Sequence, residues 1–385
     1  MSNSSNIIGN KWEDLPNEIL EIIAKHLQSR IDVFRFRAIS TSWRSIVPLS
    51  YRQTQSSLTL PPPFTATAVL SPVTICRLEH YSGGTAVLMK VVESISGELQ
   101  LLNPLSTKTF KGNSSVCRTI NLVDFRLIEL HRGSRLIFDS IPTNFYVKKV
   151  VLFYDFGILA LFDLGGLSLL SFWGFGDEEW TNLGNEGDCY DDVMSYNNQF
   201  YVINNLGIVY WIDKCRNLVQ YSPPLCGFGH LKNLVVSEGQ FYVVDSYMEE
   251  DAARMQAAMF EELGVRGRCR TVDMKVYKLD EEWGTWVDVK SLEDRVFVLG
   301  KEVCVSVSVK DFPGCQGNCI YFVDASDTKT EFQTLGETVK RFVGRVFRFD
   351  NGSVRAVECL PAYKKFSPHM NWPLAISSSR DNIAV

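Results

Sequence analysis

Apolar residues follow a helical spacing before residue 50 and a different spacing after it. In the first segment they recur at steps of three and four residues: Leu15, Ile19, Ile22, Ile23 and Leu27. That period places them on one face of a helix. Pro16 suits the first turn of this helix, Asp32 can cap a second short helix, and Ser40 or Thr41 can cap a third. We therefore predict an all-α module over residues 11–50, preceded by a flexible tail over residues 1–10.

A polar segment separates this module from the rest of the chain. Residues 51–66 are rich in Ser, Thr, Gln and Pro and include three consecutive prolines at 61–63. This composition is typical of an extended linker. From residue 67 onward, short apolar runs alternate with turn residues, which is the pattern of strands. We expect residues 67–385 to form an all-β domain.

One stretch of the later region keeps a helical spacing. Within residues 248–263, apolar side chains are four residues apart at Met255, Met259 and Leu263. This spacing predicts an amphipathic helix inserted in a loop of the β domain.

The most apolar stretch, residues 150–173, raises the question of a membrane span. Asp155 and Asp163 are its charged residues, and each would cost about 2.5–3.5 kcal/mol near the centre of a spanning helix. Glycines at 157, 165 and 166 divide the run into pieces of strand length. We predict three buried strands and no membrane contact.

Three segments of the β region resemble one another. Residues 198–204, 239–245 and 318–324 each contain an aromatic residue or isoleucine, then tyrosine, then apolar residues that end near Asp or Asn. Their spacing fits a repeat of roughly 40–50 residues, the length of a propeller blade. We predict a β-propeller, with a β-sandwich as the alternative, because a large β domain can also carry aromatic strands at loose intervals.

Composition and charge narrow the class of function. The 385 residues include 45% apolar and 22% charged residues, which indicates a folded protein, and the net charge is −5. A chain without a basic excess is a poor ligand for a phosphate backbone, so we expect no nucleic-acid partner. Ten cysteines are scattered along a chain that starts with a polar, not an apolar, segment. Reduced thiols in the nucleus or cytoplasm are the expectation.

Candidate catalytic and metal-binding groups are sparse. The five histidines have no metal-type spacing, and Cys315 and Cys319 lack a second nearby pair to complete a zinc site. There is no phosphate-binding glycine loop and no Gly-x-Ser-x-Gly elbow. We predict no catalytic residue, no metal and no cofactor.

The informative motif lies in the helical module. Residues 12–20 read Trp-Glu-Asp-Leu-Pro-Asn-Glu-Ile-Leu, and residues 37–44 read Arg-Ala-Ile-Ser-Thr-Ser-Trp-Arg. In order and spacing this resembles an F-box over residues 12–48. The resemblance implies docking on the Skp-type adaptor of an SCF ubiquitin ligase. A helical piece too small to bury its apolar face alone is suited to recognition by a partner.

The β region carries a second resemblance. Residues 175–183, 209–213, 276–280, 286–289 and 311–322 are similar to parts of a C-terminal domain found in a plant F-box protein family. The similarity extends over most of residues 67–360 and implies a kelch-like domain whose general biochemical role is poorly defined. The insertion at 248–263 and the final 20 residues do not match this pattern.

Together these features predict a non-catalytic, substrate-recognition subunit of an SCF ubiquitin ligase. The residues expected to contact the adaptor are Leu15, Pro16, Ile19, Ile39 and Trp43, with a cullin bound through the adaptor. The β domain would hold a target protein that the sequence does not identify. The alternative is a propeller enzyme or ligand-binding protein with a helical appendage, which would need polar side chains converging in a central channel. The sequence offers Asp163, Tyr201, Tyr242 and Arg254 for that role without showing that they meet.

Overall fold

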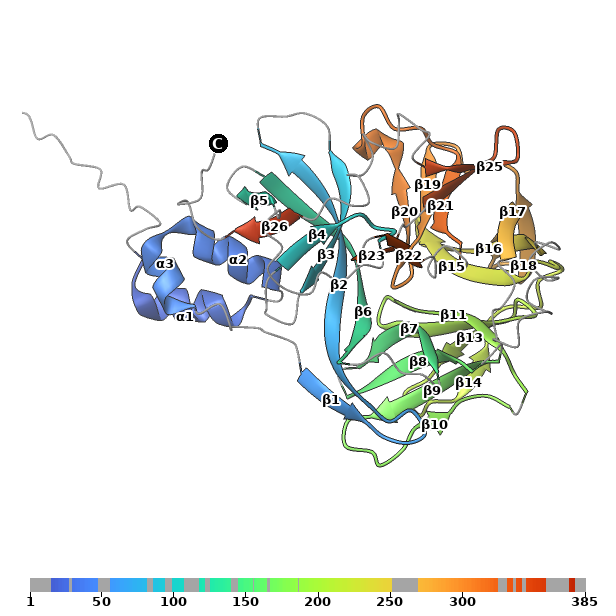
Figure 1. Ribbon diagram of the computed structural model, residues 1–385, viewed down its shortest axis with the longest axis horizontal. Helices are drawn as coiled ribbons and strands as arrows, with labels where there is room; N and C mark the ends of the chain where they lie inside the picture. Colours follow the sequence, from blue (N-terminus) through green and yellow to red (C-terminus); the bar gives the residue numbers. More distant parts are fainter. Residues whose placement is uncertain are drawn as a thin grey trace, which may run out of the picture.

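The fold combines an N-terminal group of helices with a large assembly of β-sheets. The computed structural model describes residues 15–27, 30–47, 56–81, 86–93, 99–106, 118–121, 125–139, 145–154, 156–164, 167–185, 187–250, 269–324, 331–334, 337–340, 344–357 and 374–377. Figure 1 shows the helices at one end of the molecule, beside strands β4, β5 and β26. The predicted fold class, an all-β main domain with a small all-α module before it, is confirmed.

Three short helices form the N-terminal module: α1 (Asn17–Lys25), α2 (Arg30–Ile39) and α3 (Thr41–Ile46). Pro16 is the residue before α1, and its carbonyl accepts hydrogen bonds from the first helical N–H groups. The Ser40 hydroxyl accepts the Trp43 N–H at 3.2 Å and so caps α3, as its sequence predicts. Asp32 is not the cap of the second helix, because α2 already begins at Arg30 and places Asp32 in its first turn.

The first sheet contains the longest strands of the described chain. Its strands are β1 (Ser56–Leu60), β2 (Ala66–His80), β3 (Val87–Glu93), β4 (Leu99–Leu102), β5 (Arg118–Asn121), β6 (Phe125–Phe138) and β26 (Leu374–Ser377). Their order is β6-β2-β3-β4-β26-β5, with β1 paired to the start of β2. The strand nearest the C-terminus therefore lies between two strands from the first third of the sequence, antiparallel to β4 and parallel to β5.

Next along the chain come one sheet that is joined to the first sheet and then two antiparallel meanders. The strands of the joined sheet are β7 (Tyr146–Phe153), β8 (Gly157–Asp163), β9 (Ser168–Gly174) and β10 (Thr181–Asn182). The first meander contains β11 (Tyr190–Tyr196), β12 (Gln199–Asn204), β13 (Val209–Ile212) and β14 (Leu218–Gln220). The second contains β15 (Leu231–Ser237), β16 (Gln240–Glu250), β17 (Cys269–Asp280) and β18 (Thr285–Val289). The joint to the first sheet is a single residue pair, Ser134 with Val150.

The last sheet has the order β20-β19-β21-β24-β25 and is less regular. Its strands are β19 (Arg295–Leu299), β20 (Cys304–Ser308), β21 (Cys319–Val323), β24 (Gly344–Arg348) and β25 (Ser353–Ala356), with a 3₁₀ turn, η2 (Val309–Asp311), after β20. A separate hairpin consists of β22 (Glu331–Thr334) and β23 (Glu337–Lys340). The three similar sequence segments contain β12, β16 and β21. The first two occupy the second position of a meander, whereas β21 lies in the middle of its sheet and runs parallel to β19.

Buried charged groups join successive sheets near the centre of the assembly. Lys149 on β7 pairs with Asp192 on β11 at 2.6 Å, and the second oxygen of Asp192 accepts the Leu234 N–H of β15 at 3.0 Å. Lys90 on β3 pairs with Glu302, which precedes β20, at 2.9 Å. This last pair links the first sheet to the last one, so the sheets close into the ring of a propeller.

The apolar core closes the ring in the same place. One cluster of buried side chains contains residues of the first sheet, such as Val73 and Leu88, together with residues of the last sheet, such as Val298 and Val305. Because apolar burial dominates the favourable side of folding, the ring is held mainly by such inter-sheet clusters.

Two features, in residues 51–66 and at residue 248, differ from the sequence-based expectations. Residues 51–66 are not an extended linker throughout, since Ser56–Leu60 is a strand paired with β2. The inserted helix does not begin at residue 248, because Met248 and Glu250 belong to β16 opposite β17; residues 251–263 lie outside the described residues. Within the final 20 residues, Leu374–Ser377 forms β26. The three strands predicted over residues 150–173 are confirmed as parts of β7, β8 and β9.

Candidate functional site

The helical module has its own small core. Trp43 is 5% exposed and its ring lies 4.5 Å, centroid to centroid, from that of Phe36. Around this pair pack the buried side chains of all three helices and the residue after α3: Leu20, Ala24, Val33 and Val47. The buried Arg37 guanidinium donates to the carbonyl oxygens of Arg44, at 2.9 Å, and Val47, which fixes the end of α3 on α2. Trp43 is thus a core residue of the module.

An apolar strip remains on the outside of this core. Ile19 and Ile22 on α1 are 43% and 51% exposed, and Ile39 at the end of α2 is 44% exposed. Ile19 and Ile22 are three residues apart, so they lie on the same face of α1. Exposed Glu18 and Glu21 flank them on the same helix. We call Ile19, Ile22 and Ile39 the isoleucine strip.

The five residues predicted to contact an adaptor are placed differently from one another. Pro16, Ile19 and Ile39 are exposed, Leu15 is half-buried against the module core, and Trp43 is buried inside it. The expected presentation of Trp43 to a partner is therefore wrong for this structure: its side chain is already covered by the same module. Ile22 was missed as a site residue, although its position one helical turn from Ile19 was visible in the sequence.

Val33 and Phe36 of α2 face the module core, and the opposite side of this helix packs on the β domain. Ile31 and Phe34 are buried in one cluster with residues of β2, β3, β4 and β6: Cys76, Leu78, Met89, Val91, Leu99, Leu101 and Leu127. The Arg35 guanidinium donates to the Leu127 carbonyl oxygen at the edge of the same contact. The helical module is consequently docked on the propeller through α2, while the isoleucine strip stays uncovered.

A half-open cavity of about 340 Å³ lies beside this junction. Ile31 contributes to it from α2, Leu70 and Pro72 from β2, and Val151 from β7. Its lining includes neither histidine nor cysteine. It therefore offers no cysteine nucleophile, and no imidazole base for its serines Ser134 and Ser195.

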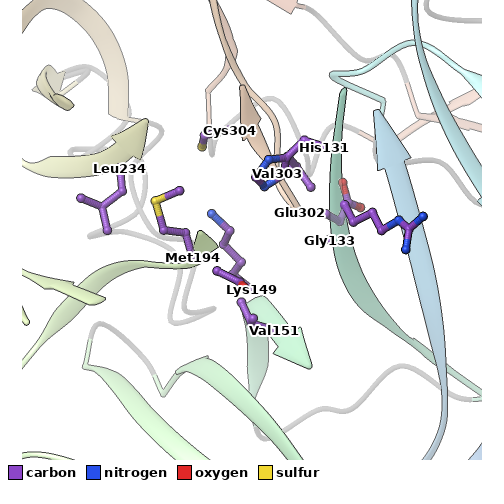
Figure 2. Close-up of a pocket in the computed structure, with 11 residues that line it drawn as sticks. His131, Gly133, Lys149, Val151, Met194, Leu234, Glu302, Val303 and Cys304 are labelled. Atoms are coloured by element: carbon purple, nitrogen blue, oxygen red, sulfur yellow. The ribbon is translucent and has the colours of Figure 1, made fainter. Parts of the chain in front are cut away.

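The centre of the ring holds a second, much smaller pocket. Its volume is about 20 Å³, enough for about one water molecule. Figure 2 shows Lys149, Met194, Cys304 and Glu302 around it, contributed by different sheets. Lys149 is paired with Asp192 and Glu302 with Lys90, and the pocket is too small for a substrate, so this centre is a structural plug.

Electrostatics at the centre follow from burial and pairing. Burial raises the pKa of the Cys304 thiol to about 12, so it stays protonated near neutral pH. Burial acts to lower the pKa of Lys149, but the Asp192 carboxylate outweighs it and the pKa is raised above 10.5. For Glu302, burial acts to raise the pKa, yet Lys90 and other cations leave it below 4.5. At neutral pH these pKa shifts keep Cys304 protonated and neutral, Lys149 positively charged and Glu302 negatively charged.

The residues named for an enzymatic alternative do not converge there. Asp163 ends β8, whereas Tyr201 and Tyr242 lie on the second strands of two different meanders. Arg254 lies outside the described residues. In the part of the chain that the structure describes, no group of three His, Cys, Asp or Glu residues could hold a metal ion, and no helix is both long and apolar enough to cross a membrane.

Comparison with known proteins agrees with the division into module and ring. The family model of the KIB1-4 beta-propeller matches residues 35–347, and that of the F-box domain matches residues 12–52. The chain belongs to the family of F-box proteins with a KIB1-4 beta-propeller. The propeller match begins inside α2, the helix that packs on the β domain.

The curated relatives are F-box proteins of Arabidopsis thaliana and match along most of their length. F-box protein SKIP23 is 29% identical over 97% of this chain and 98% of that protein. The putative F-box protein At1g65770 is 29% identical over 90% of this chain and 94% of its own length, and F-box protein At4g35733 is 29% identical over 83% and 90%. The predicted relationship to a plant F-box family is confirmed. In general this supports the role of a non-catalytic substrate adaptor of SCF ligases.

Proposed function

We propose that this chain is the substrate-recognition subunit of an SCF ubiquitin ligase that binds a Skp-type adaptor through the isoleucine strip. The observation that carries the proposal is the exposure of three isoleucines on a module whose own core is complete without them. Exposed apolar side chains that share one face are a common feature of docking surfaces. Pro16, beside the start of α1, and half-buried Leu15 would border this contact.

This assignment gives the five predicted contact residues different roles. Ile19 and Ile39, together with Ile22, would touch the adaptor directly, and Pro16 and Leu15 would border the contact. Trp43 would act indirectly, by keeping α1, α2 and α3 in the arrangement that presents the strip. A cullin would be recruited through the adaptor and not by this chain.

The test is adaptor binding by the purified full-length chain. Ile22→Glu places a carboxylate on the most exposed residue of the strip, and Leu206→Glu places one on an exposed apolar site of the propeller as the matched control. Because a central contact residue contributes about 2 kcal/mol or more, we expect Ile22→Glu to weaken adaptor binding at least about 30-fold in a calorimetric titration. Leu206→Glu should bind as the wild type does. Equal affinities of wild type and Ile22→Glu would refute the proposed surface.

The propeller would hold the ubiquitination target, in the nucleus or the cytoplasm. The proposal includes a kelch-like relationship, because the sheets form the ring of a propeller. The last sheet is the irregular blade of this ring, since β21 lies in its middle. The target class is tested by measuring which proteins accumulate in cells that lack this chain, and by ubiquitinating the candidates with the reconstituted ligase. Protein levels and ubiquitination that do not depend on the chain would argue against the target-binding role.

A further inference from the structure

Exposed aromatic side chains lie on two adjoining turns of the sheet that contains β7, β8, β9 and β10. Phe156 follows β7 and Phe175 follows β9; they are 47% and 42% exposed. The Phe175 N–H donates to the Phe156 carbonyl oxygen at 2.8 Å, so the two turns are joined. The ring of Tyr154 stacks on that of Phe156 with 6.1 Å between centroids and 12° between planes. The rings of Tyr154 and Phe156 are thus in contact, and the backbone bond places exposed Phe175 on the adjoining turn.

Two cations from the next sheet border these rings. Lys214 and Arg216 are exposed in the turn between β13 and β14. The Lys214 Nζ lies 5.8 Å from the centroid of Tyr154, and the Arg216 guanidinium carbon lies 4.9 Å from the centroid of Phe172, the buried ring next to Phe156. Cations at these distances are held by the ring faces. We call Tyr154, Phe156, Phe175, Lys214 and Arg216 the aromatic–cation patch.

The backbone of the patch is set in an uncommon conformation. Tyr154 has φ 47° and Arg216 has φ 71°, in the left-handed region that bulky residues rarely adopt. Such conformations persist where the surroundings hold them, and they often accompany binding sites. A Cβ on Gly157 would lie 2.7 Å from the Phe172 ring, so Phe172 rests directly on the hairpin that carries Phe156. The Phe172 ring and these backbone conformations thus define how the turn presents Phe156.

The charges beside the rings are positive. Lys214 lies over Tyr154 and Arg216 over Phe172, and both are exposed. A partner segment that lays an apolar side chain on Tyr154 and Phe156 would therefore find two cations beside it. Complementary charges on the partner favour one orientation and suppress others.

We propose that the aromatic–cation patch binds a segment of the target protein that carries an apolar or aromatic side chain with an acidic residue on one side. The inference rests on the proposed function only in taking the partner to be a ubiquitination target. The rings supply contact area at low entropic cost, since an aromatic side chain has few rotatable bonds. The positive charges of Lys214 and Arg216 favour a partner segment that carries an acidic residue.

The probe is a displayed library of nonapeptides with phenylalanine fixed at the centre and all other positions random. Selection on the purified full-length chain should enrich acidic residues on one side of the phenylalanine. The best peptide is then synthesised, and its affinity is measured by fluorescence anisotropy for wild type and variants. Phe156→Ala/Phe175→Ala should weaken binding at least about tenfold.

A charge reversal and a matched control separate this surface from others. Lys214→Glu/Arg216→Glu reverses the charge of two exposed turn residues and leaves the aromatic residues themselves unchanged. It should weaken binding of the acidic peptide and strengthen binding of a peptide whose acidic residues are replaced by lysine. Phe228→Ala is the control, because Phe228 is 90% exposed but follows β14 at its opposite end. It should bind the peptide as the wild type does.

The outcomes also separate this inference from the proposed function. Selection without an acidic preference, or equal affinity of the wild type and Phe156→Ala/Phe175→Ala, would overturn the patch as a binding site. Adaptor binding is measured in parallel and depends on the isoleucine strip, so its loss in Ile22→Glu is independent of these results. A chain that binds the adaptor yet ignores the peptides would retain its proposed function and lose this inference.

Discussion

Phe34 is the residue by which the helical module is most directly held on the propeller. Its side chain is buried, with Ile31, among side chains of the first sheet. Burying an apolar side chain of this size contributes about 1.5–3 kcal/mol, so Ile31 and Phe34 together favour the docked module by about 3–6 kcal/mol. A preference of that size leaves the undocked module below about 1% of molecules.

Truncation of Phe34 should remove most of this preference. A buried Phe→Ala substitution costs about 3–5 kcal/mol, because the lost contacts leave a cavity. We therefore expect docked and undocked forms of Phe34→Ala to have comparable populations. The core around Trp43 and Phe36 is on the other side of α2 and should persist, so adaptor binding by the isoleucine strip should change little.

Hydrogen exchange followed by mass spectrometry measures this opening directly. Exchange should rise at least about tenfold at β4 and along α2 in Phe34→Ala, with strands β7 and β11 unchanged. Ile22→Ala removes an equally apolar but exposed side chain of the same module and serves as the control. If α2 and β4 exchange at wild-type rates in Phe34→Ala, the packing of α2 does not hold the module and the reasoning is refuted.

Three further results are expected. Trp43→Ala should abolish adaptor binding together with the helical circular dichroism of the module, because it removes about 3–5 kcal/mol from a small core; retained helicity with lost binding would instead make Trp43 a contact residue. Burial raises the pKa of Cys76 to about 12, so iodoacetamide at pH 8 should modify exposed Cys226 and spare Cys76 in peptide mass spectra, and equal labelling would contradict this burial. Glu302→Gln should lower stability by about 3–5 kcal/mol at pH 7, since it leaves the Lys90 ammonium buried without its carboxylate. Because the pKa of Glu302 is lowered from 4.5, this difference in denaturation midpoint should shrink as the pH falls below 4.5; a difference independent of pH would contradict the ion pair.

The helical module was predictable because its spacing and caps are local features. Ser40 caps α3 through a hydrogen bond three residues away, which the sequence shows directly. The role of Trp43 was not predictable in the same way, since a large aromatic side chain suits either a small core or an interface. Only the three-dimensional arrangement shows that Phe36 already covers it.

The docking of α2 left a signal in the sequence that was missed. Its apolar residues are Ile31, Val33, Phe34, Phe36 and Ile39, which cover more than one face of a ten-residue helix. A helix that is apolar on several sides packs against more than one neighbour. In the structure Val33 and Phe36 pack in the core of the helical module, and Ile31 and Phe34 pack against the propeller.

Composition misled the interpretation of residues 51–66. Ser56–Leu60 reads as polar linker, yet its two leucines alternate with polar residues in the period of a strand. The register with β2 depends on a partner strand that begins only at Ala66. Likewise, the central plug could not be predicted, because Lys90 and Glu302 are 212 residues apart and charged residues ordinarily lie at the surface.

The position of β26 has a consequence for synthesis on the ribosome. This strand lies between β4 and β5, yet it is made more than 250 residues after them. The nascent chain therefore emerges with two strand edges that stay open until almost the whole polypeptide has been translated. Open strand edges invite pairing with other chains, so chaperones that shield them during elongation should determine the yield of this protein, and a premature stop before Leu374 should send the product to aggregation or proteolysis.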